Sequence, residues 1–307
     1  MGGPGFHAGE LAVQQRAGVR EEAARLTRML DPADLRGGLG RFLAGRTFAA
    51  LTARDHDQRL WISPLAGSPG FLAVRSATTL DIAAAPRPGD PLHGLPAGQP
   101  AGLLVVEFAA RRRVRLNGTL AAAGPGALVI EAEQAYGNCP QYIGQRILAP
   151  IETGTDHPGA DNPVRRGTGL TAGDRALIRA ADTFFLGTTH PDRGNDASHR
   201  GGTPGFVRVE DDALWWPDYP GNNMFNSFGN LAVDPAAALL FADFGTGRTL
   251  HLSGTAAVDW TGPGIAGDDG GTGRRVRFTP QRVVSGRLLP ARTVATGQAY
   301  PTPPLTG

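Results

Sequence analysis

Apolar positions follow a helical period at the start of the chain and a strand-like period after it. Residues 9–30 place Leu11, Val19 and Leu26 roughly along one stripe, which predicts a helical N-terminal segment, and residues 34–46 predict a further short helix. From residue 47 the pattern changes to short apolar runs divided by Gly, Pro and Asp. These runs read "TFAALTA", "RLWISPLAG", "GFLAV", "LLVVEF", "RVRLNGTL" and "ALVIEAE". They predict β-strands.

The same order of strands recurs in the second half of the chain. "TFFLGTT" (183–189) corresponds to "TFAALTA" (47–53), "GTPGFVRV" to "GSPGFLAV", and "LHLSGTAAV" (250–258) to "VRLNGTLAA" (114–122). The three landmarks are separated by 136, 135 and 136 residues. A constant spacing over this distance predicts an internal duplication of a whole domain.

The repeat defines the predicted domain organisation. We expect an N-terminal helical segment over residues 1–38 and a first β domain over 39–148. A polar, Gly- and Pro-rich linker over 149–170 precedes a second domain over 171–290, and a tail covers 291–307. The strand density favours barrels or sandwiches over an α/β sheet, and two copies would pack as a pseudo-dimer with sites in the seam.

Composition excludes several classes of chemistry. All 30 basic residues are arginine, so neither a lysine Schiff base nor a Walker-type phosphate loop can form. The single cysteine excludes a disulfide framework and any multi-cysteine metal site, and we predict no metal. A net charge of +2, scattered along the chain, predicts no nucleic-acid partner. We see no secretory signal and no 18-residue apolar run, so a cytoplasmic protein without a membrane partner is expected.

Three stretches carry a resemblance to a known family. They are "AYGNCPQYI" (135–143), "SHRGGTPGFVRV" (198–209) and "YPGNNMFNSFGNLAVDPAAALLF" (219–241). Together with the strand order they resemble the pyridoxamine 5′-phosphate oxidase-like flavoproteins, over about 39–145 and 172–284. The resemblance implies a mainly β fold with flanking helices, in which two tandem FMN-binding split β-barrels form a pseudo-dimer. In that family FMN lies between two barrels, strand two lines the isoalloxazine, and a loop before a helix holds the phosphate.

Carried over by position, the resemblance implies a set of cofactor-binding residues. They are Ser198, His199, Arg200, Gly201 and Gly202 on strand two, Asn222, Asn223, Phe225, Asn226 and Ser227 in the phosphate loop with Asn230 after it, and Tyr136, Asn138 and Cys139 from the first copy. The residue types suit this role. The two glycines let a flat ring approach the backbone, and an arginine fork suits phosphate or the carbonyl edge of a flavin. Asn and Ser beside a helix N-terminus donate to phosphate. The corresponding loop of the first copy (83–100) lacks the Asn/Ser series, so we expect one FMN site per chain.

Some residues allow two interpretations. His199 is the candidate catalytic acid or base. The alternative is that it makes a hydrogen bond that fixes the polar end of its strand. Arg111, Arg113 and Arg115 alternate along one strand and predict a solvated face, with contact to FMN or an acidic partner as the alternative. Cys139 is expected to be an inert buried thiol, unless it contacts the flavin or reacts.

Other motifs indicate structural roles or limit the expected function. "DHD" (55–57) predicts a hairpin turn rather than metal ligands, and "GPGIAG" (262–267) lacks the strand–helix context of a dinucleotide fingerprint. The Trp-Trp pair at 215–216 either covers the flavin or belongs to the core. The last predicted strand, "RRVRFTPQRVVSGRLLP", lacks the Arg-x-His of the family's true oxidases, so synthesis of pyridoxal phosphate is not expected.

The preferred function is an FMN-dependent oxidoreductase that acts on a small molecule or on reduced nicotinamide, NAD(P)H. One alternative is a non-catalytic flavin-binding module that passes electrons to a redox partner protein. Another is a split barrel that uses F420 or haem. The duplication permits a monomer, whereas the N-terminal helix could pair two chains into a homodimer.

Overall fold

The computed structural model describes residues 5–151, 163–264 and 270–302. Half of the predicted linker (152–162), the second half of the 262–267 loop and the last five residues of the predicted tail lie outside the described residues. None of the described helices combines the length and the apolar character that crossing a membrane requires.

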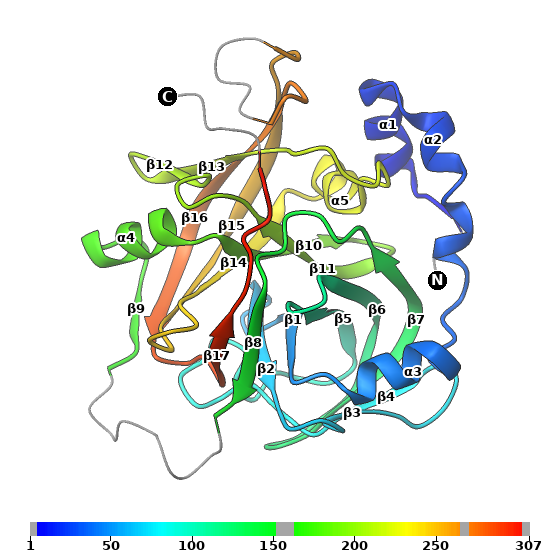
Figure 1. Cartoon of the computed structure of the whole chain (residues 1–307), viewed down its shortest axis with the longest axis vertical. Helices are drawn as coiled ribbons and strands as arrows, with labels where there is room; N and C mark the ends of the chain where they lie inside the picture. Colours follow the sequence, from blue (N-terminus) through cyan, green and yellow to red (C-terminus); the bar gives the residue numbers. More distant parts are fainter. Residues whose placement is uncertain (1–4, 152–162, 265–269, 303–307) are drawn as a thin grey trace.

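Two sheets of matching topology make up most of the molecule (Figure 1). The first has the order β2-β1-β5-β6-β7-β4-β3, and the second has the order β11-β10-β14-β15-β16-β13-β12. The bounds in the first sheet are β1 (Phe48–Arg54), β2 (Leu60–Ala66), β3 (Leu72–Val74), β4 (Thr79–Ile82), β5 (Gln99–Glu107), β6 (Arg112–Ala123) and β7 (Leu128–Asn138). In the second sheet they are β10 (Thr183–His190), β11 (Gly194–Gly201), β12 (Arg208–Glu210), β13 (Ala213–Pro217), β14 (Ala236–Ala242), β15 (Thr249–Trp260) and β16 (Arg274–Gly286). The two orders coincide strand for strand, which confirms the predicted mainly β fold built from two tandem copies.

Short strands extend and connect the two sheets. β9 (Arg165–Gly167) pairs with β16 at the entry to the second copy. β8 (Arg146–Pro150) and β17 (Ala291–Thr296) form a separate two-stranded ribbon, so the predicted tail begins with a strand. The "DHD" stretch lies in the turn between the antiparallel strands β1 and β2, as expected for a hairpin.

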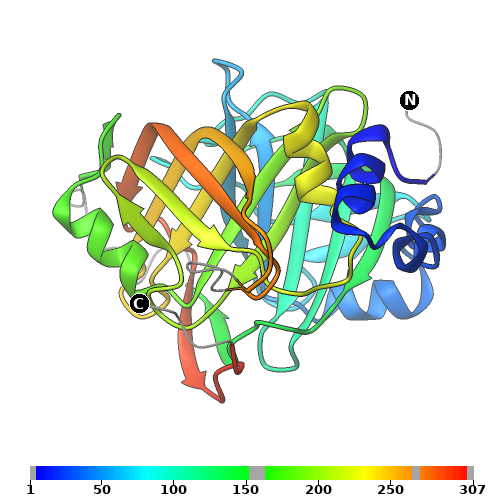
Figure 2. The ribbon, with the colours of Figure 1, turned by 90° about the horizontal axis from the view of Figure 1, so that it is seen from above.

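The N-terminal segment is a chain of short helices. Its elements are α1 (Ala8–Ala17), α2 (Arg20–Ala24), the 3₁₀ turn η1 (Thr27–Leu30) and α3 (Gly37–Ala44). The segment is helical as predicted but is not one continuous helix, because Gly18 takes a left-handed φ of 71° and ends α1. α1 packs against α5 (Asn226–Val233) of the second copy (Figure 2). α4 (Ala172–Ala180) begins with a capping box between Thr171 and Asp174.

Three large apolar clusters make up most of the core in the described residues. One apolar cluster fills each copy, and a third joins them through Phe48 and Leu104 from the first sheet and Phe185 and Leu240 from the second. Strand β11 lies against β5 and β6 across this seam. A Cβ at Gly102 would lie 2.7 Å from the backbone of Asp196, so glycine lets the two sheets approach closely there. The seam is therefore a packed interior interface, and any site in it is shaped by both copies.

Candidate functional site

A cleft of about 850 Å³, counted out to open solvent, lies in the seam between the two copies. The first copy contributes the start of β6 and the end of β7, and the second contributes β11, the end of β13 and the loop that leads into α5. The position agrees with the expectation that sites lie between the copies.

The wall from the first copy is cationic. Arg113 and Arg115 are two residues apart on β6 and so point to the same side of the strand. Arg115 Nη1 donates to Asp196 Oδ2 at 2.8 Å, and Arg113 Nη1 donates to His199 Nδ1 at 3.0 Å. The prediction of a solvated face is wrong for both, because β11 of the other copy covers them. Arg111 lies before the strand and donates to the carbonyl of Ile143 instead.

The second copy adds two more guanidinium groups and a second carboxylate. Arg274 Nε donates to Asp218 Oδ2 at 2.8 Å, and Arg200 lies 4.0 Å from the same carboxylate. Burial raises the pKa of Asp218 and lowers the pKa of Arg200. Asp218 and Arg274 were not predicted as site residues. Neither residue belongs to a recognisable sequence motif, and only the fold brings them to the cleft.

Arg113 is the least compensated of these cations. Burial, and next the charges of Arg115 and Arg200, lower its pKa to about 9. Within the described chain it forms no ion pair with a carboxylate, and its Nε has no hydrogen-bond partner. A half-buried guanidinium without a carboxylate partner is costly to the folded protein and is a candidate for anion binding.

Several buried N–H donors on the cleft wall have no partner in the described structure. They are Nε of Arg113, Arg115 and Arg200, Nδ2 of Asn138 and Nε1 of Trp216. The amide of Asn138 is oriented by Asn222 Nδ2, which donates to its Oδ1 at 3.1 Å. Because buried donors normally have partners, this wall is complementary to a ligand rich in acceptors.

Most of the predicted cofactor-binding residues reach the cleft. The residues that line it are Asn138, Cys139, His199, Arg200, Gly201, Asn222, Asn223, Phe225, Asn226 and Ser227. Four predicted residues do not line it: Tyr136, Ser198, Gly202 and Asn230. Cys139 is half-buried rather than fully buried, and Trp216 both lines the cleft and belongs to the core.

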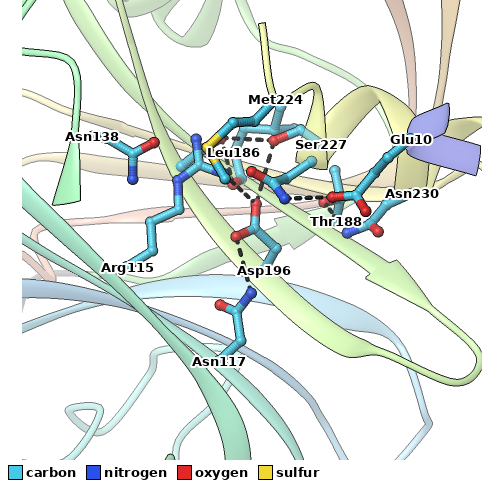
Figure 3. Close-up of polar contacts among 12 residues, drawn as sticks. Glu10, Arg115, Asn117, Asn138, Leu186, Thr188, Asp196, Met224, Ser227 and Asn230 are labelled. Atoms are coloured by element: carbon cyan, nitrogen blue, oxygen red, sulfur yellow. Dashed lines mark hydrogen bonds and ion pairs between the residues drawn. The ribbon is translucent and has the colours of Figure 1, made fainter. Parts of the chain in front are cut away.

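The four remaining residues lie behind or beside the wall. Ser198 is fully buried and accepts from Ser227 Oγ at 3.3 Å, and Tyr136 packs with Leu30 and Met224. Gly202 packs against the ring of Phe206. Asn230 Nδ2 donates to Thr188 Oγ1 at 3.0 Å, and its Oδ1 is 3.1 Å from His7 Nε2. Figure 3 shows Asn230 turned toward Thr188.

His199 lies on the wall with both ring nitrogens in contact with neighbours. Nδ1 accepts from Arg113, and Nε2 is 3.4 Å from Thr183 Oγ1. Burial, together with Arg113, Arg146 and Arg200, lowers the pKa of His199 well below its ordinary value. The ring is therefore neutral at physiological pH, and these bonds fit the alternative interpretation in which it fixes the polar end of its strand. Its catalytic role stays a prediction.

The predicted phosphate loop makes a tight approach to α5. Asn223 and Phe225 both have a left-handed φ of 59°, and Met224 N donates to Asn222 Oδ1. The first turn of a helix leaves backbone N–H groups without intrahelical partners, and the first turn of α5 lies at the cleft. The side chains of Asn226 and Ser227 bond within the protein, to Glu10 and Asp196 respectively. Phosphate binding by these two side chains stays a prediction.

The mouth of the cleft is aromatic and joins the two copies. Tyr142 stacks on Tyr219 with ring centroids 4.9 Å apart, and its hydroxyl donates to the carbonyl of Pro220. A Cβ at Gly201 would lie 1.9 Å from the carbonyl oxygen of Tyr142, so only glycine fits there. Tyr142 was not predicted, although it lies within the "AYGNCPQYI" stretch.

The symmetry-related position is filled by side chains. The 136-residue spacing places His251 on β15 where Arg115 stands on β6. His251 Nδ1 is 3.0 Å from the carbonyl oxygen of Ile62, its Nε2 is 3.8 Å from Asp90, and Ser63 donates to Asp90 at 2.5 Å. His251, Asp90 and Ser63 are all buried. The duplication therefore keeps an arginine-lined cleft at one of its two equivalent positions.

Comparison with known proteins places the second copy in a family. Residues 170–263 match the family model described as pyridoxamine 5′-phosphate oxidase. A search of curated proteins finds no match.

Solved structures similar to this chain come from several bacteria. HupZ from Group A Streptococcus has 12% identity and covers 42% of this chain and 98% of its own, with a TM-score of 0.30. A protein of the pyridoxinephosphate oxidase family from Clostridium acetobutylicum has 16% identity, covers 39% and 90%, and has a TM-score of 0.27. HutZ, the haem storage protein of Vibrio cholerae, has 12% identity, covers 38% and 95%, and has a TM-score of 0.29.

The family match covers α4 and β10 to β15, together with the loop into α5 that forms one wall of the cleft. This region of the second copy is therefore similar to the pyridoxamine 5′-phosphate oxidase family, and the first copy repeats its strand order.

Proposed function

We propose that the seam cleft binds flavin mononucleotide, and that the protein is an FMN-dependent oxidoreductase of a small molecule or of reduced nicotinamide. The observation that carries this proposal is the excess of buried arginine donors on the cleft wall. Arg113, Arg115, Arg200 and Arg274 face two carboxylates, those of Asp196 and Asp218. Four guanidinium groups against two carboxylates leave two positive charges, which a phosphate monoester of about −1.5 to −2 at neutral pH would balance.

The chain's own residues divide into two groups for this ligand. The phosphate would be held by Arg113 and Arg200 together with the backbone N–H groups of the first turn of α5. The donors of Asn138 and Trp216 would face the acceptor-rich edge of the ring system. When bound, the flavin supplies the redox chemistry, and the protein supplies orientation, charge and exclusion of water.

His199 and the tyrosines would shape the remaining space. Because the neutral His199 ring holds the Arg113 guanidinium, it keeps that cation directed at the cleft. Tyr142 and Tyr219 close the mouth and would exclude water from one side of a bound ring. A small substrate would enter past these two side chains.

Spectroscopy of the purified protein tests this proposal. The absorption spectrum, followed by heat release and identification of the bound molecule, should show FMN at one equivalent per chain. Separate titrations with riboflavin, F420 and haemin distinguish the alternatives. Riboflavin lacks the phosphate and should bind at least tenfold more weakly than FMN, since a charge-assisted contact contributes about 1.5–3 kcal/mol. Preferential binding of haemin or F420 would refute the FMN proposal.

A second experiment separates an enzyme from an electron carrier. NAD(P)H is added to the FMN-loaded protein under anaerobic conditions, and bleaching of the flavin band is followed. Reduction by NAD(P)H alone supports an oxidoreductase that uses nicotinamide. A flavin that is reduced only in the presence of a partner reductase would support the electron-transfer module instead.

A further inference from the structure

The N-terminal helix α1 lies directly against α5. The two helices meet at a pair of glycines. A Cβ at Gly9 would lie 2.3 Å from the carbonyl oxygen of Gly229, and a Cβ at Gly229 would lie 2.4 Å from Glu10 Cγ. No larger residue fits at either position without moving one helix. The contact is therefore specific to these two elements.

Three polar side chains of α1 and its cap end on the same short segment. The Glu10 carboxylate accepts from Asn226 Nδ2, and Gln14 Nε2 donates to the carbonyl of Met224 at 3.1 Å. His7 Nε2 lies 3.1 Å from Asn230 Oδ1. The three partners fall within residues 224–230, which include the first turn of α5 and part of the cleft wall. Figure 3 shows Glu10 entering this network from the α1 side.

Glu10 is the central member of the contact. It is 3% exposed, and its second oxygen accepts from the backbone N–H of His7 at 2.8 Å. Both carboxylate oxygens thus serve as acceptors, one for the cap of α1 and one for Asn226. A protonated carboxyl or a carboxamide would offer only one acceptor oxygen, so it could not satisfy both donors.

The charges around Glu10 come from three elements. His7 lies on its own helix cap, Arg193 precedes β11, Asp196 lies on β11, and His190 lies at the end of β10 beside His7. Burial is the largest effect and raises the pKa of Glu10 to about 7, with Asp196 acting in the same direction and Arg193 against it. Both protonation states of Glu10 are therefore populated near neutral pH.

We propose that Glu10 is a positioning residue of the cleft, because its carboxylate holds Asn226 and so orders the first turn of α5 and the loop before it. The N-terminal helix then forms part of the ligand site, although it lies outside both barrels and outside the span that matches the family model. Only the identity of the ligand, FMN, depends on the proposed function. The ordering of residues 222–230 by Glu10 does not, because it is a property of the ligand-free protein.

Hydrogen exchange on the ligand-free full-length chain tests the order of this segment directly. Wild type, Glu10→Gln and the matched control Glu21→Gln are compared at pH 8 and pH 6, as protection factors for peptides that cover residues 222–230. Glu21 is an exposed carboxylate on α2. At pH 8 we expect Glu10→Gln to lose about tenfold in protection, the value of one charge-assisted hydrogen bond of about 1.4 kcal/mol. Glu21→Gln should match wild type.

The pH dependence separates positioning from simple packing. Wild type should approach Glu10→Gln at pH 6, where its own carboxyl is protonated, and Glu10→Gln should show equal protection at both pH values. Equal protection of wild type and Glu10→Gln at pH 8 would overturn the proposal. If Glu10→Gln unfolds globally, Gln14→Ala tests the same helix contact through Met224, and unchanged protection of residues 222–230 in that variant also overturns it.

FMN titration of the same variants completes the test. We expect Glu10→Gln to weaken FMN binding about fivefold to tenfold at pH 8 relative to Glu21→Gln. If no variant binds FMN, the proposed function fails, and the exchange data still decide whether Glu10 orders the segment. If FMN binds equally to all variants while exchange differs, Glu10 orders the segment without positioning the cleft, and the proposal is refuted.

Discussion

Replacing Asp196 with asparagine tests whether this one carboxylate holds the seam together. Asp196 is 2% exposed and accepts from three donors: Arg115 Nη1 at 2.8 Å, Ser227 Oγ at 3.3 Å and Asn117 Nδ2 at 3.4 Å. The donors come from β6 of the first copy and from α5 of the second (Figure 3). The carboxylate therefore connects both copies and the cleft wall at a single point.

The expected cost follows from burial of the Arg115 charge. Arg115 is 9% exposed, and asparagine at position 196 would leave its guanidinium without a counter-charge in the seam. Removing one partner of a buried ion pair costs about 3–5 kcal/mol. We therefore expect Asp196→Asn to lower the free energy of unfolding by about 3 kcal/mol or more, a change of over about a hundredfold in the unfolding constant.

Equilibrium urea unfolding followed by tryptophan fluorescence measures this loss, with Asp212→Asn as the control. Asp212 also pairs with an arginine, Arg175, but its side chain is 89% exposed, so its replacement should leave the unfolding midpoint unchanged. The double variant Asp196→Asn with Arg115→Gln should recover part of the loss, because it removes the uncompensated charge. A free energy of unfolding for Asp196→Asn within about 1 kcal/mol of wild type would refute the reasoning.

Three further predictions address packing, pH and the cleft mouth. Gly229→Ala should destabilise the protein by about 1–3 kcal/mol, because the added Cβ would overpack against Glu10. Gly126→Ala is the control, since a Cβ there meets open space and should leave stability unchanged. Urea unfolding measures the free energy of unfolding of both variants. The pKa of His199 is depressed in the folded state, so the unfolded chain binds a proton that the folded chain does not, and the contribution of His199 to stability is present above pH 6.5 and lost as the pH falls. Between pH 7.5 and pH 5 the free energy of unfolding should therefore decline less steeply in His199→Gln than in wild type. Equal slopes in the two proteins would contradict this. Gly201→Ala should displace the carbonyl of Tyr142 and weaken FMN binding in a titration, and an unchanged Kd would exclude a role for this contact.

The duplicated β architecture could be predicted from the sequence, because it rests on local patterns. The alternation of apolar residues, the turn residues and the constant spacing of Thr47 and Thr183 belong to each segment by itself. The two sheets follow the same order for this reason. The helical N-terminal segment could also be predicted, but its apolar stripe crosses Gly18, so the break that the left-handed conformation of Gly18 makes after α1 could not.

The site was predicted less completely, because its key contacts cross between segments far apart in sequence. Arg113 and Arg115 follow the alternating pattern of a strand with one solvent-exposed face. In the structure β11 of the other copy packs against this face and covers it. Asp196 and Glu10 carry no motif at all. Their roles depend on the packing of β11 against β6 and of α1 against α5. The local sequence pattern predicts helices and strands, whereas the side chains that line the cleft between the two copies depend on which strand and helix faces pack together.

FMN titration of wild type, Arg113→Gln and Arg277→Gln tests the central claim most directly. Arg277 is an exposed arginine on β16 and serves as the matched loss of charge away from the cleft. We predict one FMN per wild-type chain, an affinity about tenfold to a hundredfold weaker for Arg113→Gln, and wild-type affinity for Arg277→Gln. Equal affinity in all three proteins, or two equivalents of FMN per chain, would contradict a single flavin site built on the arginines of the seam.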